Sequence, residues 1–217
     1  MARWLASHPD IFMSSVKEPH YFSTDLRNRI VTSSARYTKL FSVAQSRQRA
    51  IGEASTWYLY SQNAIPNIEQ TCPGAKYIVM TRDPVEMAVS LHHHNLRVLH
   101  ENEPNFEIAW ALQEIRATGL RIPGTCKEPI FLQYKAACSL GSHLERLYAQ
   151  VSADRVLHIE LGDLQANPSL EYQRVLAFLD VPDDMRRSFP SANHARGYRS
   201  RTFQVLLRTA SRLKSSM

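Results

Sequence analysis

A cation, a carboxylate and an imidazole lie within four positions near the start of the chain, in the stretch Lys17-Glu-Pro-His-Tyr-Phe22. A carboxylate or an imidazole can accept the proton of a reacting hydroxyl, and a nearby cation can stabilise the charge that develops on a leaving group. If the stretch is extended, Glu18 and His20 point to one side and Lys17 to the other. The residue types indicate an acid–base site; the alternative is a surface ion pair beside packed aromatic residues.

A second candidate site combines a guanidinium and a hydroxyl eight residues apart. Arg82 follows the apolar stretch Tyr77-Ile-Val-Met-Thr81, which predicts a short buried strand. Asp83 is followed by proline, a pair typical of a helix start, and we predict a helix from Pro84 to about His100. That helix could bring Arg82 and Ser90 toward one face, where helix amides also favour an anion. The pair is either a phosphate site or an arginine paired with a carboxylate beside a solvated serine.

The alternation of strands and helices predicts the fold class. Further strands are expected at 48–54 and 155–161, and helices at 106–117, at 134–151 and from Asn167-Pro168 onward. Strands that alternate with longer helices are typical of α/β proteins with a mostly parallel sheet. Ligands of such sheets bind beyond the C-terminal strand ends, where Arg82 is expected to lie.

The charge distribution separates a near-neutral body from a basic end. The chain has 217 residues and a net charge of +6, yet the segment from Arg186 to Met217 holds eight Lys or Arg and no Asp or Glu. We predict a single domain, 1–217, with a basic C-terminal segment at 185–217 that either closes on a small polyanion or forms a solvated helix end. We expect no membrane span, because no apolar run approaches about 20 residues. No nucleic-acid-binding motif is recognisable, so nucleic acid is not an expected partner.

Cysteine and histidine spacing gives no sign of a metal site. Cys72, Cys126 and Cys138 lack paired or zinc-type spacing, which favours reduced thiols and a cytoplasmic location. The run His92-His-His94 falls in the predicted helix, where successive side chains diverge by about 100°, so we expect a solvated helix face rather than a metal site. We therefore expect no metal.

Four segments resemble one enzyme family in the same order along the chain. Residues 75–90 closely resemble the 3′-phosphate-binding segment of sulfotransferases that use 3′-phosphoadenosine 5′-phosphosulfate (PAPS) as the sulfuryl donor. The stretches 8–22, 51–59 and 156–164 are similar to further blocks of that family. The resemblance is strongest to the bacterial and heparan-sulfate-type branches, which carry a KEPHFF-like stretch. It implies an α/β, P-loop-like three-layer fold with a mostly parallel central sheet flanked by helices.

The resemblance also implies roles for individual residues. Arg82 and Ser90 would bind the 3′-phosphate of the donor. Lys17 would supply a cation for the charge that develops on the bridging oxygen of the leaving nucleotide. Glu18 would be the general base, with His20 as the alternative. The basic segment that contains Arg196, Gly197 and Tyr198 resembles a loop that closes on the same phosphate, where glycine allows close approach of backbone amides.

The acceptor is expected to be a small molecule or a glycan that offers a hydroxyl or an amine, with a carbohydrate favoured by the branch resemblance alone. Glu53 either lines the cleft or pairs structurally. Trp57 and Tyr58 are candidates for adenine or acceptor contacts, although core packing explains at least one of them.

One family feature is missing from the sequence. The glycine-rich loop that wraps the 5′-phosphosulfate should directly precede Ala2, where only Met1 stands. We therefore expect an N-terminally truncated fold, and losing such a charge-stabilising group costs on the order of 10²–10³ in rate. The alternative function is a truncated or degenerate, catalytically impaired protein that binds PAPS or its product, 3′-phosphoadenosine 5′-phosphate (PAP). A small-molecule kinase is a more distant alternative, because no Mg²⁺ site is evident.

Overall fold

The chain forms two compact units in the computed structural model, which describes residues 1–190. Unit 1 comprises 1–82 together with the described residues from 141 onward, and unit 2 comprises 83–140. The strands assigned within the described residues all lie in unit 1, whereas unit 2 is helical. The prediction of a single domain over 1–217 stays a prediction, and the candidate residues Arg196, Gly197 and Tyr198 lie outside the described residues.

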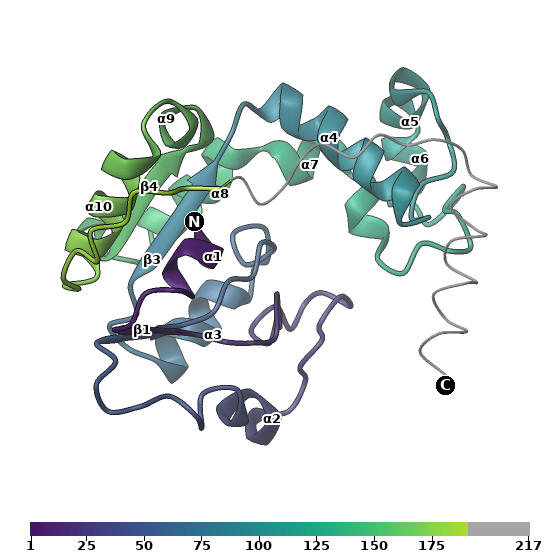
Figure 1. The fold of residues 1–217 in the computed structure, drawn as a ribbon. Coiled ribbons are helices and arrows are strands. Elements are labelled where there is room, and N and C mark those ends of the chain that lie inside the picture. The colour runs from purple at the N-terminus through teal and green to yellow at the C-terminus, as the bar shows by residue number, and fades with distance from the viewer. Residues whose placement is uncertain (191–217) are drawn as a thin grey trace, which may run out of the picture. The chain divides into compact units, whose positions relative to one another are not determined.

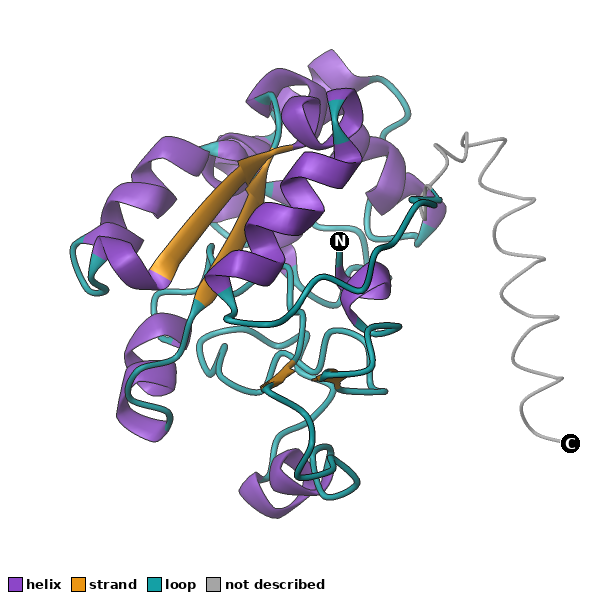
Figure 2. Cartoon of the chain, turned by 60° about the vertical axis from the view of Figure 1, so that its left-hand side comes forward, coloured by secondary structure: helices purple, strands orange, loops and turns teal. Residues whose placement is uncertain are grey.

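Parallel strand pairing in unit 1 confirms the predicted α/β class. Strand β1 (Ile11–Met13) pairs with β2 (Ala50–Gly52), and β3 (Tyr77–Thr81) pairs with β4 (Val156–Glu160), both in parallel. Within residues 1–190 the strands therefore form two two-stranded sheets instead of one continuous sheet. Figure 2 shows the longer pair, β3 and β4, with helices packed along it. The predictions for β2, β3 and β4 are correct, whereas β1 was not predicted.

Helices cover both faces of the β3–β4 pair, as alternation along a strand requires. Tyr77 and Val79 of β3 pack in one apolar cluster with residues of α3 (Ala64–Thr71) and α8 (Leu140–Tyr148). Ile78, which lies between them in sequence, packs in a second cluster with residues of α9 (Leu161–Ala166) and α10 (Pro168–Phe178). The β3–β4 part of unit 1 thus has the predicted three layers, helix, sheet and helix (Figure 1).

Unit 1 contains two more α-helices. The short α1 (Ala2–Leu5) buries Trp4 and Leu5 in the second cluster, beside α10. Helix α2 (Ser34–Lys39) begins at Ser33, whose side chain accepts a hydrogen bond from the amide of Arg36. Serine favours this position because its oxygen satisfies an amide that the helix leaves without a partner.

Unit 2 starts with α4 (Pro84–Arg97), whose start agrees with the prediction. The helix ends three residues earlier than predicted because Leu99 adopts a left-handed conformation with φ of 60°. The predicted helix at 106–117 is split at Leu112 into α5 (Phe106–Ala111) and α6 (Gln113–Ala117). The predicted helix at 134–151 is likewise interrupted: α7 (Tyr134–Cys138) ends at Ser139, whose ψ of 58° is not helical, before α8 begins.

A buried ion pair joins the helices of unit 2. Arg116 donates to both oxygens of Glu101, over 2.6 and 2.7 Å, and the side chains are 1% and 0% exposed. The hydroxyl of Tyr134 donates to the same carboxylate over 2.8 Å. Burial alone raises the pKa of Glu101, but these hydrogen bonds outweigh it and the pKa is lowered.

Among residues 1–190, no helix is both long enough and apolar enough to span a membrane.

Candidate functional site

The loop that follows β1 brings together three of the predicted site residues. Nζ of Lys17 lies 3.2 Å from Oε1 of Glu18, and Nε2 of His20 lies 3.5 Å from its Oε2. The stretch is not extended, because Glu18 and His20 have φ angles of 53° and 51°, in the left-handed region. These turns replace the alternation of a strand, so Lys17 does not face away from Glu18 but contacts the same carboxylate as His20.

The three side chains differ sharply in exposure. Lys17 is 81% exposed and Glu18 is 29% exposed, whereas His20 is only 4% exposed. Interaction with His20, followed by that with Lys17, lowers the pKa of Glu18 to about 2, although partial burial opposes the shift. The distance of 3.5 Å between His20 and Glu18 is at the outer limit for a hydrogen bond. The charges of Lys17 and His20 also lower the pKa of Glu18. Glu18 is therefore a partly exposed, ionised carboxylate backed by a buried imidazole.

Hydrogen bonds from two other segments hold the backbone of this loop. The carbonyl of Pro19 accepts from the amides of Ile30 and Val31, both over 3.1 Å. The amide of His20 donates to Oγ of Ser55 over 3.0 Å. Left-handed conformations of residues other than glycine cost on the order of 1–3 kcal/mol each and persist where the surroundings impose them. These contacts supply such a restraint.

Glu53 contacts the loop of Glu18 and His20 indirectly, through the hydroxyl groups of Ser55 and Tyr58. Its two oxygens accept from Oγ of Ser55 over 2.8 Å and from the hydroxyl of Tyr58 over 2.5 Å. The Tyr58 hydroxyl accepts in turn from the amide of Phe22 over 3.3 Å. Burial raises the pKa of Glu53, although the two hydroxyl donors oppose the shift. Sequence reasoning left Glu53 undecided and did not assign this role to Tyr58 or name Ser55. The local signal is weak, because hydroxyl groups two and five residues after a glutamate are common.

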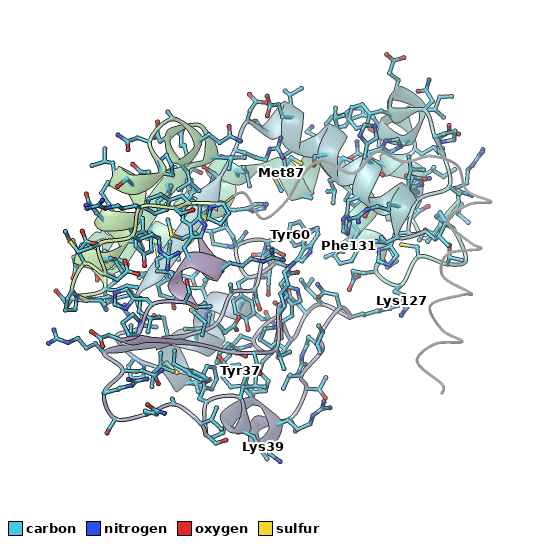
Figure 3. All side chains as sticks on the ribbon, viewed as in Figure 1. Tyr37, Lys39, Tyr60, Met87, Lys127 and Phe131 are labelled. Atoms are coloured by element: carbon cyan, nitrogen blue, oxygen red, sulfur yellow. The ribbon has the colours of Figure 1, made fainter. Side chains whose placement is uncertain are left out.

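Aromatic side chains support the far end of the loop. Tyr21 stacks on Tyr37 of α2 with 4.3 Å between ring centroids and 15° between ring planes. The buried Phe22 ring meets the rings of Tyr37 and Tyr58 edge-on. Tyr37, labelled in Figure 3, thus links α2 to the candidate site. These contacts give Tyr58 a packing role in addition to its hydrogen bonds, as expected for at least one of the two aromatic candidates.

The two residues of the predicted phosphate-binding pair belong to different units. Arg82 directly follows β3 as the last residue of unit 1 before the junction, and Ser90 is exposed on α4 of unit 2. The carboxylate of Asp83 accepts from the amides of Val85 and Glu86, both over 2.9 Å. The predicted Asp83 cap is therefore confirmed, and it engages helix amides that were expected to favour an anion. The convergence of Arg82 and Ser90 stays a prediction.

The histidine run is only partly solvated. His93 and His94 are exposed, but His92 is fully buried and its Nε2 contacts the carbonyl of Glu103 at 2.8 Å. Burial lowers the pKa of His92. The prediction of a solvated face is therefore wrong for His92, which helical spacing turns toward the core of unit 2. No group of three or more His, Cys, Asp or Glu side chains that could hold a metal ion occurs among residues 1–190.

Comparison with known proteins gives consistent matches. The model of the family described as "Sulfotransferase domain" matches residues 59–197, more than half of the chain. The membrane-associated sulfotransferase kil1 of Dictyostelium discoideum is 33% identical over 100 residues, which are 46% of this chain and 21% of that protein. The chain thus matches about a fifth of the length of that relative. A crystal structure of a sulfotransferase from Alicyclobacillus acidocaldarius matches with a TM-score of 0.72 and 27% identity, over 87% of this chain and 80% of that one.

Proposed function

The chain belongs to the sulfotransferase domain family, and from this premise we propose that it transfers a sulfuryl group from PAPS to a hydroxyl or amine acceptor, with Glu18 as the general base. The observation that carries the assignment of Glu18 is that its side chain is more exposed than that of its contact partner His20. The carboxylate is partly exposed while the imidazole is buried, so an acceptor reaches Glu18 first. In this assignment His20, the alternative base, contacts the Glu18 carboxylate and holds it in place.

The proposed reaction forms one bond to sulfur and breaks another. The acceptor oxygen or nitrogen attacks the sulfur of the donor, and the bond between sulfur and the bridging oxygen of the 5′-phosphate breaks. The acceptor proton passes to Glu18, and PAP leaves with the additional negative charge. The low pKa of Glu18 makes it a weak base toward a free hydroxyl. We therefore expect the proton to move as the new bond to sulfur forms, because this makes the acceptor proton more acidic.

The donor side of the proposal rests on Arg82, Ser90 and Lys17. A guanidinium and a hydroxyl are suitable donors to a 3′-phosphate. The amides of Val85 and Glu86 are engaged by Asp83, so this proposal assigns the phosphate to side chains. Lys17 is largely exposed, and its ammonium group is available to compensate charge on the leaving phosphate. The family resemblance adds Arg196, Gly197 and Tyr198 to the residues proposed to bind the 3′-phosphate.

The proposed acceptor is a small molecule or a glycan. The relative from Dictyostelium discoideum is named a membrane-associated sulfotransferase, and that name specifies no acceptor. A screen of carbohydrate, lipid, peptide and small-metabolite acceptors with sulfur-labelled PAPS identifies the class. A protein that binds the nucleotide but transfers to none of them is the alternative function, a catalytically impaired PAP-binding protein.

Two substitutions test the assignments separately. We expect Arg82→Ala to weaken PAP binding at least about 30-fold in calorimetry, because removing one partner of a charged contact costs roughly 2–5 kcal/mol. We expect Glu18→Gln to keep PAP binding and to lose at least about 10²-fold in turnover. Arg47→Ala is the control, since Arg47 is an exposed arginine of the same unit.

The results can contradict each assignment on its own. Unchanged PAP affinity in folded Arg82→Ala protein would remove Arg82 from the donor site. Near-normal turnover in Glu18→Gln protein would transfer the role of base to His20 or to another group.

A further inference from the structure

Glu53 is joined to the loop of Glu18 and His20 by two hydroxyl groups, and we propose that it is a positioning residue that holds this pair in its reactive geometry. The inference rests on the proposed function, because it adds a residue to the sulfuryl-transfer site. Glu53 acts through Ser55 and Tyr58, whose hydroxyl groups bind the loop backbone.

Two chains of hydrogen bonds, which we call arms, run from Glu53 to the loop, and each ends on a backbone amide of the loop. In the first arm the amide of His20 donates to Ser55, which donates to Oε2 of Glu53, over 3.0 and 2.8 Å. In the second arm the amide of Phe22 donates to Tyr58, which donates to Oε1 of Glu53, over 3.3 and 2.5 Å. One carboxylate therefore holds the loop at two points, on His20 and two residues beyond it.

The two arms match an ionised Glu53. A hydroxyl group has one proton to donate, and in each arm the hydroxyl oxygen accepts from a backbone amide. In the hydrogen bonds of the structure both hydroxyl groups donate to Glu53, and both of its oxygens accept. A carboxylate meets this demand, whereas the side-chain amide of glutamine offers only one accepting oxygen. Glu53→Gln thus breaks one arm while preserving the size of the side chain.

The loop depends on such restraint because its conformation is intrinsically unfavourable. Glu18 and His20 are both left-handed, and neither is a glycine. The segment that starts at Glu53 also touches the reactive carboxylate directly, since Oγ1 of Thr56 lies 3.3 Å from Oε2 of Glu18. When the arms are loosened, we expect the backbone to relax from these turns and Glu18 to separate from His20.

The test compares three variants that cut the arms with one matched control. Glu53→Gln leaves one accepting oxygen for the two arms, Ser55→Ala removes the first arm and Tyr58→Phe removes the second. The control is Glu69→Gln, because Glu69 also accepts from a tyrosine hydroxyl, that of Tyr77, but is otherwise engaged by Arg155. The primary measurement is the pKa of Glu18 from carboxyl ¹³C NMR. The second compares kcat and KM for PAPS, and the third is PAP affinity by calorimetry.

A positioning role predicts a specific combination of results. We expect Glu53→Gln to raise the pKa of Glu18 by one unit or more, because the carboxylate loses the contact with His20. We expect kcat to fall about 10–100-fold with little change in KM for PAPS or in PAP affinity, since a displacement of about 1 Å can cost about 10²-fold in rate. Ser55→Ala and Tyr58→Phe each remove one arm and should change the same quantities in the same direction, and Glu69→Gln should change none of them.

Other outcomes overturn the inference without ambiguity. If the pKa of Glu18 is unchanged in the folded variants, Glu53 contributes to packing only and the proposal fails. If Glu53→Gln does not fold, the two single-arm variants carry the test. If the wild-type chain transfers sulfuryl groups to no acceptor, the proposed function fails. The NMR measurement then still decides whether Glu53 holds the Glu18–His20 pair.

Discussion

The low pKa of Glu18 predicts that this carboxylate stabilises the protein at neutral pH and stops doing so in acid. Its pKa is lowered from 4.5 to about 2 in the folded protein. A group with a lowered pKa contributes stability above its unfolded value, and the contribution is lost as the pH falls toward the folded value. The loss should therefore occur between about pH 4.5 and pH 2.

The size of the effect follows from the same shift. One pKa unit corresponds to about 1.4 kcal/mol, so the shift sets an upper value of about 3 kcal/mol. The Glu18 side chain is partly exposed, and its Lys17 partner is largely solvated, so solvent screening reduces this value. We expect Glu18→Gln to lower the free energy of unfolding by about 1–3 kcal/mol at pH 7 and by less than half of that near pH 3.

Urea denaturation of the wild type and the variant at pH 7, 5 and 3 measures this difference. Glu145→Gln is the control, because Glu145 is exposed on α8 and a surface change should stay within about 0.5 kcal/mol. The raised pKa of Glu53 produces the opposite trend, but it is shared by both proteins and largely cancels in the comparison. A difference between wild type and Glu18→Gln that is the same at pH 7 and pH 3 would refute the reasoning.

Two further predictions concern unit 2. Asp83→Ala should cost about 1 kcal/mol in urea denaturation, because it removes the acceptor of two helix amides; Asp83→Asn, which keeps an accepting oxygen, should cost less, and equal losses would contradict a capping role. Arg116→Met should cost about 3–5 kcal/mol, because it leaves the buried Glu101 carboxylate without its cation. Adding Glu101→Gln to Arg116→Met should restore part of that loss, and no recovery would contradict the charge argument.

The parts of the fold with strong local signals could be predicted from the sequence. The apolar run of β3 followed by Asp83-Pro84 specifies a strand, a cap and a helix start within eight residues, and the structure has all three. Strand β1 has three residues, too few for a periodic pattern, and its partner β2 lies far along the chain. Leu112 is a residue type that does not normally mark a helix end, and the single serine at Ser139 is a weak signal within an otherwise helical pattern.

The candidate site shows the same division between local and long-range information. The residue types of Glu18 and His20 were sufficient to identify both as candidate acid–base groups, and the structure places them in contact. Their left-handed backbone could not be predicted, because neither is glycine or asparagine and the conformation depends on hydrogen bonds from distant residues. The role of Ser55 likewise depends on the direction of its hydroxyl group, which the fold determines.

The two partners of Glu18 differ in their access to dissolved ions. Lys17 extends into solvent, whereas His20 is enclosed by the protein. Raising the salt concentration from about 0.1 to 1 M shortens the screening length from about 10 to 3 Å and weakens exposed charge pairs far more than buried ones. Ionic strength should therefore act on the Lys17 contact and leave the His20 contact largely unchanged. The carboxylate thus has an inner partner that is fixed by the fold and an outer partner whose influence the surrounding medium can adjust.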